Sequence, residues 1–403
     1  MKVLQVNILG ATLSTGRTTR EMHTYFKEHG IESYIACPMR RDCEDAFVFS
    51  SRLEVKVDYV LTKYTGMEAQ LAMLPTLRLI RYMNRLKPDI VHLRVLHGNC
   101  IHLKLLLSYL AKKNIATVVT MHDFWYMTGM CFYYTDKNCD RWKTGCGNCP
   151  GIPNDIREKK FDRTRTLWRR KQQGFGGIKR LAVIGVSDWV THEITQSLLA
   201  SAKLIRRIYN WIDLSTFRPV DGSALRKAYN LDGKFVILAI SAVWKTGDSK
   251  GLEYYLRLAS EMPEHYCILL VGDMCYDKDL PDNVIAIKRT DNKEQLAQYY
   301  SMADVYLNLS EQETFGKVSA EAISCGTPVV AYDVTANGEI VAPGGGIKVI
   351  TRDSADVLRA LKKIEQTGKA QYTSICRKYA EENFDMETNI RQYLDVYQEL
   401  LDM

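Results

Sequence analysis

Two glutamates with seven residues between them, Glu313 and Glu321, flank a Phe-Gly pair in the segment EQETFGKVSAE, residues 311–321. Carboxylates accept hydrogen bonds from hydroxyl groups, so acidic side chains bordering one crevice are suited to holding sugar rings. A solvated loop glutamate and an ordinary glutamate early in a helix are the simpler explanation of such a pair. The residues around the pair favour the first interpretation.

These residues predict a strand followed by a helix. An apolar run, DVYLNLS, ends near Leu309 or Ser310, and the later Gly-Thr-Pro at 326–328 is typical of a helix end. The helix is therefore expected to begin close to Phe315 or Gly316. Its unpaired N–H groups and the positive end of its dipole suit a phosphate. The N–H groups expected there belong to Gly316, Lys317 and Val318, and Phe315 is expected to help shape the ligand pocket.

Four cysteines within nineteen residues form a second group with chemical potential: Cys131, Cys139, Cys146 and Cys149. The last two make a C-x-x-C pair, and four thiolates can close a tetrahedral zinc site. The gaps before this pair match no standard zinc finger, so buried thiols or, outside a reducing compartment, two disulfides are alternatives. A closed site of this kind leaves no open coordination position, so a metal held here is expected to be structural.

A basic segment, residues 157–180, carries ten Lys or Arg and two acids, with Phe161, Leu167 and Trp168 among them. A solvated helix with charged faces is the simplest interpretation. Peripheral contact with an anionic membrane surface is the sharper hypothesis, because basic amphipathic helices bind such surfaces. Binding of a phosphate-rich acceptor without a membrane is a third.

The elements that must position these residues follow an alternating pattern. Short β-rich runs such as KVLQVNIL, DIVHLRVL and ATVVTMH alternate with helical patterns such as RTTREMHTYFKEHG, and the pattern restarts at FVILAIS. Alternation of this kind predicts an α/β fold with two successive doubly wound parallel sheets. Periodicity is lost near residues 205–220, so we expect domains at 1–205 and 206–384, with the helical segment 385–403 joining the first.

Composition limits the class of protein. The 403 residues contain 46% hydrophobic and 25% charged side chains, as globular proteins do, and no apolar run is long enough to span a bilayer. The first residues lack the pattern of an export signal, and eleven cysteines, an odd number, argue against a disulfide scaffold. We therefore expect a cytoplasmic protein. Its net charge of +7 favours anionic partners without choosing among them.

The glutamate segment, extended to ETFGKVSAEAISCGTPVV, resembles the signature of retaining nucleotide-sugar glycosyltransferases of the GT-B type. Other segments extend the resemblance over nearly the whole chain. It implies two Rossmann-like domains facing across a cleft, the first on the acceptor side and the second holding the nucleotide sugar. It also implies that Glu313 contacts the donor sugar and Glu321 the ribose. The segment HDFW…TG.C is similar to a subgroup associated with bacterial surface-polysaccharide assembly.

The resemblance implies further site residues in the second domain. In ISAVWKTGDSKGLEYYLRLA, it places Lys250 on the donor diphosphate, where an ammonium beside a helix N-terminus would neutralise phosphate. The family usually has an arginine a few residues earlier. Here Trp244 and Lys245 occupy that neighbourhood, so Lys245 is expected to substitute.

In the first domain, the resemblance places Gly16 in the loop after the first strand, near the donor phosphates and the acceptor. His122, at the end of the strand in VVTMHDFW, is expected to contact the donor sugar. His97, in RVLHGN, is a lesser candidate from the neighbouring strand.

The expected activity is transfer of a sugar, with retention, from a UDP- or GDP-sugar to a glycan or polyprenyl-linked acceptor in surface-polysaccharide synthesis. No carboxylate is obviously placed as a nucleophile and no Asp-x-Asp motif lies beside the site, so we expect front-face attack without a catalytic metal. The enzyme is expected to work in the cytoplasm, at the inner face of the membrane, without binding nucleic acid.

Two other functions fit parts of the sequence. A zinc-containing nucleic-acid-binding protein could be built from the cysteines and the basic segment, although no helix-turn-helix or aromatic RNA platform is evident. An epimerase of nucleotide sugars would need an acid and a base across the cleft, for which His97 and His122 are the available residues.

Overall fold

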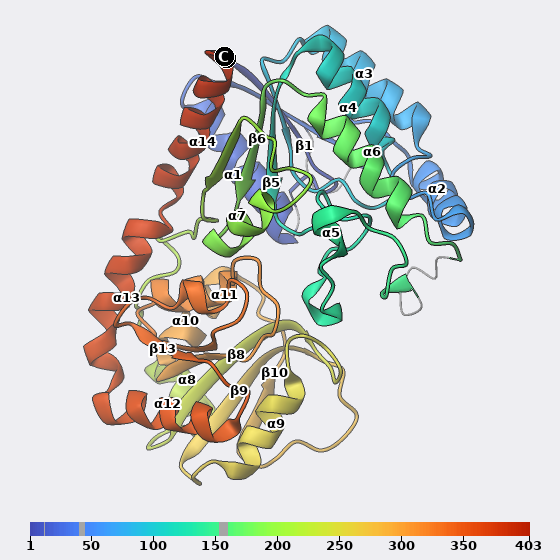
Figure 1. The fold of residues 1–403 in the computed structure, drawn as a ribbon. Coiled ribbons are helices and arrows are strands. Elements are labelled where there is room, and N and C mark those ends of the chain that lie inside the picture. The colour runs from blue at the N-terminus through green and yellow to red at the C-terminus, as the bar shows by residue number, and fades with distance from the viewer. Residues whose placement is uncertain (12, 40–44, 153–159) are drawn as a thin grey trace. The chain divides into compact units, whose positions relative to one another are not determined.

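The computed structural model describes all residues except 12, 40–44 and 153–159 (Figure 1). Contacts divide the chain into two compact units: unit 1 contains residues 1–208 and 390–403, and unit 2 contains residues 209–389. The division expected from the sequence lay between residues 205 and 206, with segment 385–403 in the first domain.

Unit 1 is built on a seven-stranded sheet in the order β3-β2-β1-β4-β5-β6-β7, and every recorded strand pair is parallel. The central strands are buried on both faces, as strands covered by helices on both sides must be. The strands are β1 (Lys2–Val6), β2 (Glu32–Cys37), β3 (Phe47–Val48), β4 (Ile90–Leu93), β5 (Ala116–Met121), β6 (Leu181–Gly185) and β7 (Leu204–Arg207).

The helices of unit 1 connect these strands and cover the sheet (Figure 1). They are α1 (Leu13–Glu28), α2 (Arg52–Thr65), α3 (Met73–Leu86), α4 (Leu103–Lys113), α5 (Arg141–Thr144), α6 (Thr164–Gly176), α7 (Asp188–Thr195) and, from Ile390 on, the C-terminal α14 (Met386–Leu401), with a 3-10 turn, η1, at Thr135–Lys137. Of the described residues, none forms a helix with the length and apolar character needed to cross a membrane.

Unit 2 repeats the design with six strands in the order β10-β9-β8-β11-β12-β13, again paired in parallel. The strands are β8 (Phe235–Trp244), β9 (Tyr266–Met274), β10 (Val284–Ile287), β11 (Val305–Asn308), β12 (Val329–Tyr332) and β13 (Gly346–Val349). The helices are α8 (Ser223–Ala228), α9 (Leu252–Glu261), α10 (Lys293–Met302), α11 (Lys317–Ser324), α12 (Ser354–Thr367) and α13 (Lys369–Asn383), with a 3-10 turn, η3, at Gly338–Ile340.

The strand orders fix where ligands can be held. In each sheet the first strand lies inside: β1 has β2 on one side and β4 on the other, and β8 has β9 on one side and β11 on the other. The connections leave such a strand in opposite directions, which opens a crevice at the carboxyl ends of the strands. The loops after β1 and β4, and those after β8 and β11, are therefore the places to look for functional side chains.

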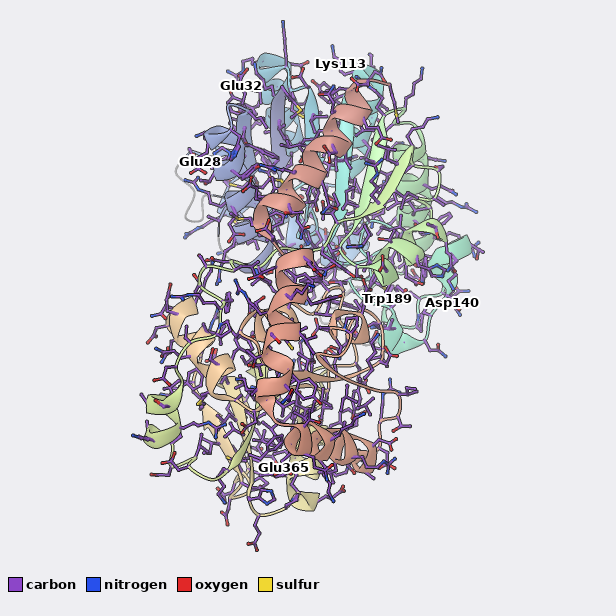
Figure 2. The ribbon with its side chains drawn as sticks, turned by 90° about the vertical axis from the view of Figure 1, so that its left-hand side faces the viewer. Glu28, Glu32, Lys113, Asp140, Trp189 and Glu365 are labelled. Atoms are coloured by element: carbon purple, nitrogen blue, oxygen red, sulfur yellow. The ribbon has the colours of Figure 1, made fainter. Side chains whose placement is uncertain are left out.

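The C-terminal helix α14 is held to the sheet of unit 1 through buried polar contacts. Figure 2 shows it in front of the strands. The Tyr397 hydroxyl lies 2.7 Å from Nδ1 of His92, and Nε2 of His92 lies 2.7 Å from Oγ1 of Thr120. Oγ1 of Thr120 also lies 3.2 Å from the Tyr393 hydroxyl. Burial lowers the pKa of His92 well below its ordinary value, so the imidazole is neutral and needs these partners.

We predict that Tyr397→Phe destabilises the protein by about 1–3 kcal/mol, because the buried Nδ1 of His92 loses its only recorded partner and water cannot replace it. The measurement is the shift of the urea unfolding midpoint relative to wild type. Tyr59→Phe removes the same hydroxyl from an exposed position on α2 and should leave the midpoint unchanged. Equal effects of the two substitutions would contradict the structural role of this contact.

Candidate active site

The loop between β11 and α11 carries the glutamate segment. Gly316 precedes the helix and adopts φ 80° and ψ 52°, a left-handed conformation that costs other residues energy. The N–H groups of Ser319 and Ala320 donate to the Gly316 carbonyl, which closes the first turn. The N–H groups of Gly316, Lys317 and Val318 precede these bonds and so have no acceptor within the helix. The expected helix start near Phe315 or Gly316 is thus close to the observed one.

Lys250 and Glu313 meet at the carboxyl edge of the unit 2 sheet. Their Nζ and Oε1 atoms are 2.5 Å apart, and the two residues come from the loops after β8 and β11. The backbone joins the same loops, because the Glu311 N–H donates to the Ser249 carbonyl at 2.8 Å. Glu313 is also held from the loop after β12, where Oγ1 of Thr335 accepts from its N–H at 3.1 Å. The pair therefore occupies the crevice that the strand order predicts.

Glu321 is buried on α11, about one and a half turns beyond the helix start. The Tyr300 hydroxyl, from α10, donates to Oε2 of Glu321 at 3.0 Å. Burial, and then the charge of Glu321, raise the pKa of Tyr300 well above its ordinary value, so the hydroxyl keeps its proton and stays a donor. Tyr300 was not predicted from the sequence, because residues on separate helices carry no local signal of their contact.

Two other predicted site residues of unit 2, Phe315 and Lys245, lie outside the Lys250–Glu313 ion pair. The Phe315 side chain is buried against the rings of Tyr209 and Phe384, so only its backbone is available to a ligand at the helix start. Lys245 follows β8 in the same loop as Lys250, is more than half exposed, and has its ammonium 3.6 Å from Oδ2 of Asp248.

In unit 1, His122 ends up beside an arginine that sequence analysis missed. Arg94 follows β4, is almost fully buried, and places Nη2 3.2 Å from Nε2 of His122. It also donates to Oγ1 of Thr18 at 2.8 Å and to Oε1 of Gln5 at 3.3 Å. The sequence signal that could have identified Arg94 was a charged residue directly after an apolar strand. Arg94 and His122 follow neighbouring strands, next to the point where β1 and β4 diverge.

His97 and Gly16 both make close contacts with neighbouring residues of unit 1. Nε2 of His97 lies 3.1 Å from Oδ2 of Asp123, and its ring packs on that of Phe132. Gly16 was expected in the loop after β1, and this was wrong, because α1 begins at Leu13 and includes it. A Cβ at Gly16 would lie 3.0 Å from the backbone of Ala11, so the glycine lets the helix approach that loop.

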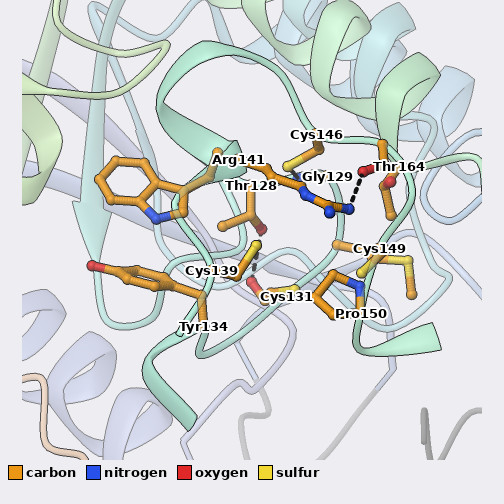
Figure 3. Close-up of a pocket in the computed structure, with 13 residues that line it drawn as sticks. Thr128, Gly129, Cys131, Tyr134, Cys139, Arg141, Cys146, Cys149, Pro150 and Thr164 are labelled. Atoms are coloured by element: carbon orange, nitrogen blue, oxygen red, sulfur yellow. Dashed lines mark hydrogen bonds between the residues drawn. The ribbon is translucent and has the colours of Figure 1, made fainter. Parts of the chain in front are cut away.

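Residues 131–149 form the cysteine-rich segment. Its four cysteines line one cavity, across which the side chain of Arg141 extends (Figure 3). All ten cysteines of the described residues are free thiols. A hydrogen bond from Cys131 lowers the pKa of the Cys149 thiol, and the N–H of Gly129 donates to Sγ of Cys146 at 3.2 Å. Among the described residues, no group of three or more His, Cys, Asp or Glu side chains is arranged to hold a metal ion.

The basic segment forms α6 over most of its described part, and residues 157–159 lie outside the described residues. Two of its three named apolar members, Leu167 and Trp168, are buried and so do not face outward as a membrane contact requires. The Trp168 Nε1–H donates to the carbonyl of Trp142 at 2.9 Å, so α6 packs on the cysteine-rich segment. Only Phe161, before the helix, is an exposed aromatic of this segment as far as it is described.

Comparison with protein families decides the class. The family model described as Glycosyltransferase Family 4 matches residues 15–216, half of the chain, and the model described as Glycosyl transferases group 1 matches residues 224–383. The chain is a group 1 glycosyltransferase. The nucleic-acid-binding alternative finds no support in these comparisons.

Two curated relatives illustrate the similarity of this glycosyltransferase. The putative colanic acid biosynthesis glycosyl transferase WcaC of Escherichia coli K12 is 25% identical over 321 residues, which are 78% of this chain and 77% of WcaC. The D-inositol 3-phosphate glycosyltransferase of Mycobacterium sp. strain KMS is 30% identical over 158 residues, 36% of this chain and 33% of the relative. The second match thus spans about a third of that relative's length.

Solved structures match the glycosyltransferase from end to end. Sucrose-phosphate synthase from Thermosynechococcus elongatus aligns with a TM-score of 0.68 and 16% identity, covering 100% of this chain and 99% of the other. Anabaena HepE in complex with UDP-glucose aligns with a TM-score of 0.66 and 17% identity, covering 100% of both chains. The predicted fold class, GT-B with two Rossmann-like parallel-sheet domains, is confirmed.

We predict that Gly316→Ala lowers the stability of the glycosyltransferase by about 1–2 kcal/mol, because an alanine in the left-handed region is strained although its methyl group has space. The urea unfolding midpoint measures this cost. Gly176→Ala is the matched control, since Gly176 ends α6 without a positive φ and with no atom near the added methyl group. An unchanged midpoint for Gly316→Ala would mean that α11 can begin without this backbone conformation.

Proposed function

We propose that this glycosyltransferase transfers a sugar, with retention of configuration, from a nucleotide-sugar donor to a glycan or lipid-linked acceptor in surface-polysaccharide synthesis. The observation that carries the proposal is the meeting of Lys250, Glu313 and the N-terminus of α11 at the crevice of unit 2. Similarity to WcaC supports the polysaccharide assignment, and the HepE complex with UDP-glucose supports a nucleotide-sugar donor.

Each group in this crevice has a chemical task in the proposal. The helix N-terminus and Lys250 take the donor diphosphate, with Lys245 as a second cation in the same loop. Glu313 accepts hydrogen bonds from the sugar and Glu321 from the ribose. Without ligand, the Lys250 ammonium and the Glu313 carboxylate neutralise each other. In unit 1, His122 contacts the donor sugar, and Arg94 positions it by donating to Nε2.

The reaction proposed is a front-face substitution without a catalytic metal. The bond between the anomeric carbon and the phosphate oxygen breaks, and the acceptor oxygen bonds to that carbon from the same face. The acceptor proton passes to the departing phosphate oxygen. Lys250 and the N–H groups of α11 stabilise the negative charge that grows on the leaving diphosphate, which lowers the barrier electrostatically. We place the enzyme in the cytoplasm, at the inner face of the membrane, where a lipid-linked acceptor would lie. The free thiols of the described residues suit the reducing environment of the cytoplasm.

We predict that a UDP- or GDP-sugar raises the melting temperature of the wild-type protein, since a ligand bound only by the folded state stabilises it. With the sugar identified in this way, Glu313→Gln should reduce kcat/KM by about ten- to a hundredfold, the loss expected for one charge-assisted hydrogen bond. Its affinity for the nucleotide diphosphate alone should change little. Glu321→Gln should weaken binding of the nucleotide diphosphate as well.

Glu311→Gln is the control, because Glu311 lies in the same loop but pairs with Tyr254 and Arg352. It should retain wild-type turnover. If no sugar nucleotide stabilises the protein, or if the double variant of Glu313 and Glu321 turns over normally, the donor site is wrongly assigned.

We also propose that Cys131, Cys139, Cys146 and Cys149 hold a structural Zn²⁺. Four thiols on one cavity supply the ligand type that zinc prefers, and the segment from η1 through α5 has little regular structure of its own. As the four sulfurs stand, they do not form a group arranged around an ion, so the proposal requires them to close on the metal. No substrate step is assigned to this zinc.

We predict about one zinc per chain in protein purified without chelator, measured by elemental analysis. Cys146→Ser combined with Cys149→Ser should remove the zinc and lower the melting temperature by several degrees, because structural zinc contributes folding free energy. Cys275→Ser, at an exposed cysteine outside the cluster, should change neither value. Protein without zinc, whether its four thiols titrate freely or are oxidised in pairs, would contradict the proposal.

A further inference from the structure

Helix α2 of unit 1 exposes its apolar side chains and buries polar ones. Five large side chains recur at helical spacing and are each 45–71% exposed, which forms a continuous stripe on one side of the helix. They are Leu53, Val57, Val60, Leu61 and Tyr64. The opposite side faces the interior with Asp58 and Thr62, which are buried. A helix packed on a core in water ordinarily has the reverse arrangement.

Within α2, the exposed charges beside the apolar stripe are cations. Within α2, all of which is described, the exposed charged residues are Arg52 and Lys56. Neither acid of the helix adds an unpaired negative charge to the surface. Asp58 is buried, and Oε1 of Glu54 lies 2.8 Å from Nη1 of Arg78 on α3. The surface is therefore both apolar and positively charged.

The neighbouring chain extends this surface at the C-terminal end of α2. The Lys160 N–H donates to the carbonyl of Lys63 at 3.2 Å, and the Lys160 ammonium lies 4.7 Å from the centre of the Tyr64 ring. Phe161, next in the chain, is 53% exposed. Lysines flanking aromatic and aliphatic side chains can reach outward to anionic groups while their stems cover apolar surface. We call the stripe, Arg52, Lys56, Lys160 and Phe161 the α2 face.

We propose that the α2 face docks onto an anionic lipid bilayer. An exposed apolar patch of this kind marks a surface that something covers, and cations around it select an anionic cover. A second copy of the chain is a poor occupant, because a two-fold contact would bring the exposed cations of α2 against those of its symmetry mate, while the acids of α2 are buried or already paired. A bilayer accepts the stripe among its acyl chains and gives the cations lipid phosphates. The biological role of this docking rests on the proposed function, since a lipid-linked acceptor would lie in the bilayer.

The test measures partition of the full chain onto vesicles, without donor or acceptor. Wild-type protein should co-sediment with vesicles of phosphatidylglycerol and phosphatidylcholine, less so at high salt, and weakly with phosphatidylcholine alone. Replacing Leu53, Val57 and Val60 by serine should lower the partition coefficient by at least about tenfold. Arg52→Glu with Lys56→Glu should do the same for the anionic vesicles only.

Ile375→Ser is the matched control, since Ile375 is an exposed large apolar residue on α13, outside the α2 face. It should partition as wild type does. The melting temperature, with and without the stabilising nucleotide, should be unchanged in all these variants, which separates loss of docking from loss of the donor site. Wild-type binding that survives the serine replacements would overturn the proposal. So would protein that ignores vesicles and instead forms a dimer that those replacements dissociate.

Discussion

A buried polar network fixes the loop that joins β11 to α11, and the candidate donor site depends on it. The side chain of Asn308 donates to Oγ of Ser319 at 2.9 Å and accepts from the N–H of Ser310 at 3.1 Å. The side chain of Asn337 donates to the carbonyls of Asn308 and Ser310, both at 3.1 Å. Such a network, away from water, holds its members strongly and specifies one conformation. The helix start and Glu313 therefore stand in fixed places before any ligand arrives.

The two units use the same topology with different electrostatics. Each places polar residues at or beside the point where the sheet order reverses. In unit 1 they follow β4 and β5, next to the reversal between β1 and β4, and in unit 2 they follow β8 and β11, between which the order reverses. In unit 2 the charges compensate, because Lys250 faces Glu313. In unit 1 the buried Arg94 makes its recorded hydrogen bonds to Gln5, Thr18, Met22 and His122, and burial lowers its pKa. A buried cation of this kind is costly unless hydrogen-bond acceptors surround it, which accounts for its contacts with Oε1 of Gln5 and Oγ1 of Thr18.

The sequence predicted what is local in the chain. Alternating strands and helices, the start of α11 and the glutamate pair depend on short-range patterns, and the observed elements agree with them. Tyr300 and Arg94 could not be found in this way, because their partners are distant in sequence and their burial depends on packing. Gly16 was misplaced for a related reason. Its glycine suggested a loop, whereas the tight approach of α1 to Ala11 is what excludes a side chain there.

Helices α2 and α6 show why charge and periodicity do not reveal which side of a helix faces outward. The basic α6 buries Leu167 and Trp168, whereas α2 keeps its apolar stripe exposed. The rotation of α2 is fixed at both ends. At its start, Ser51 and Glu54 cap each other's backbone and Glu54 pairs with Arg78; at its end, Gly66 packs against the Phe161 carbonyl.

Turning α2 over would break these contacts, so the helix keeps Asp58 inside, where burial raises the pKa of its carboxyl to about 6. A fold that retains a costly buried acid to hold an apolar stripe outward is consistent with a stripe that has a partner of its own.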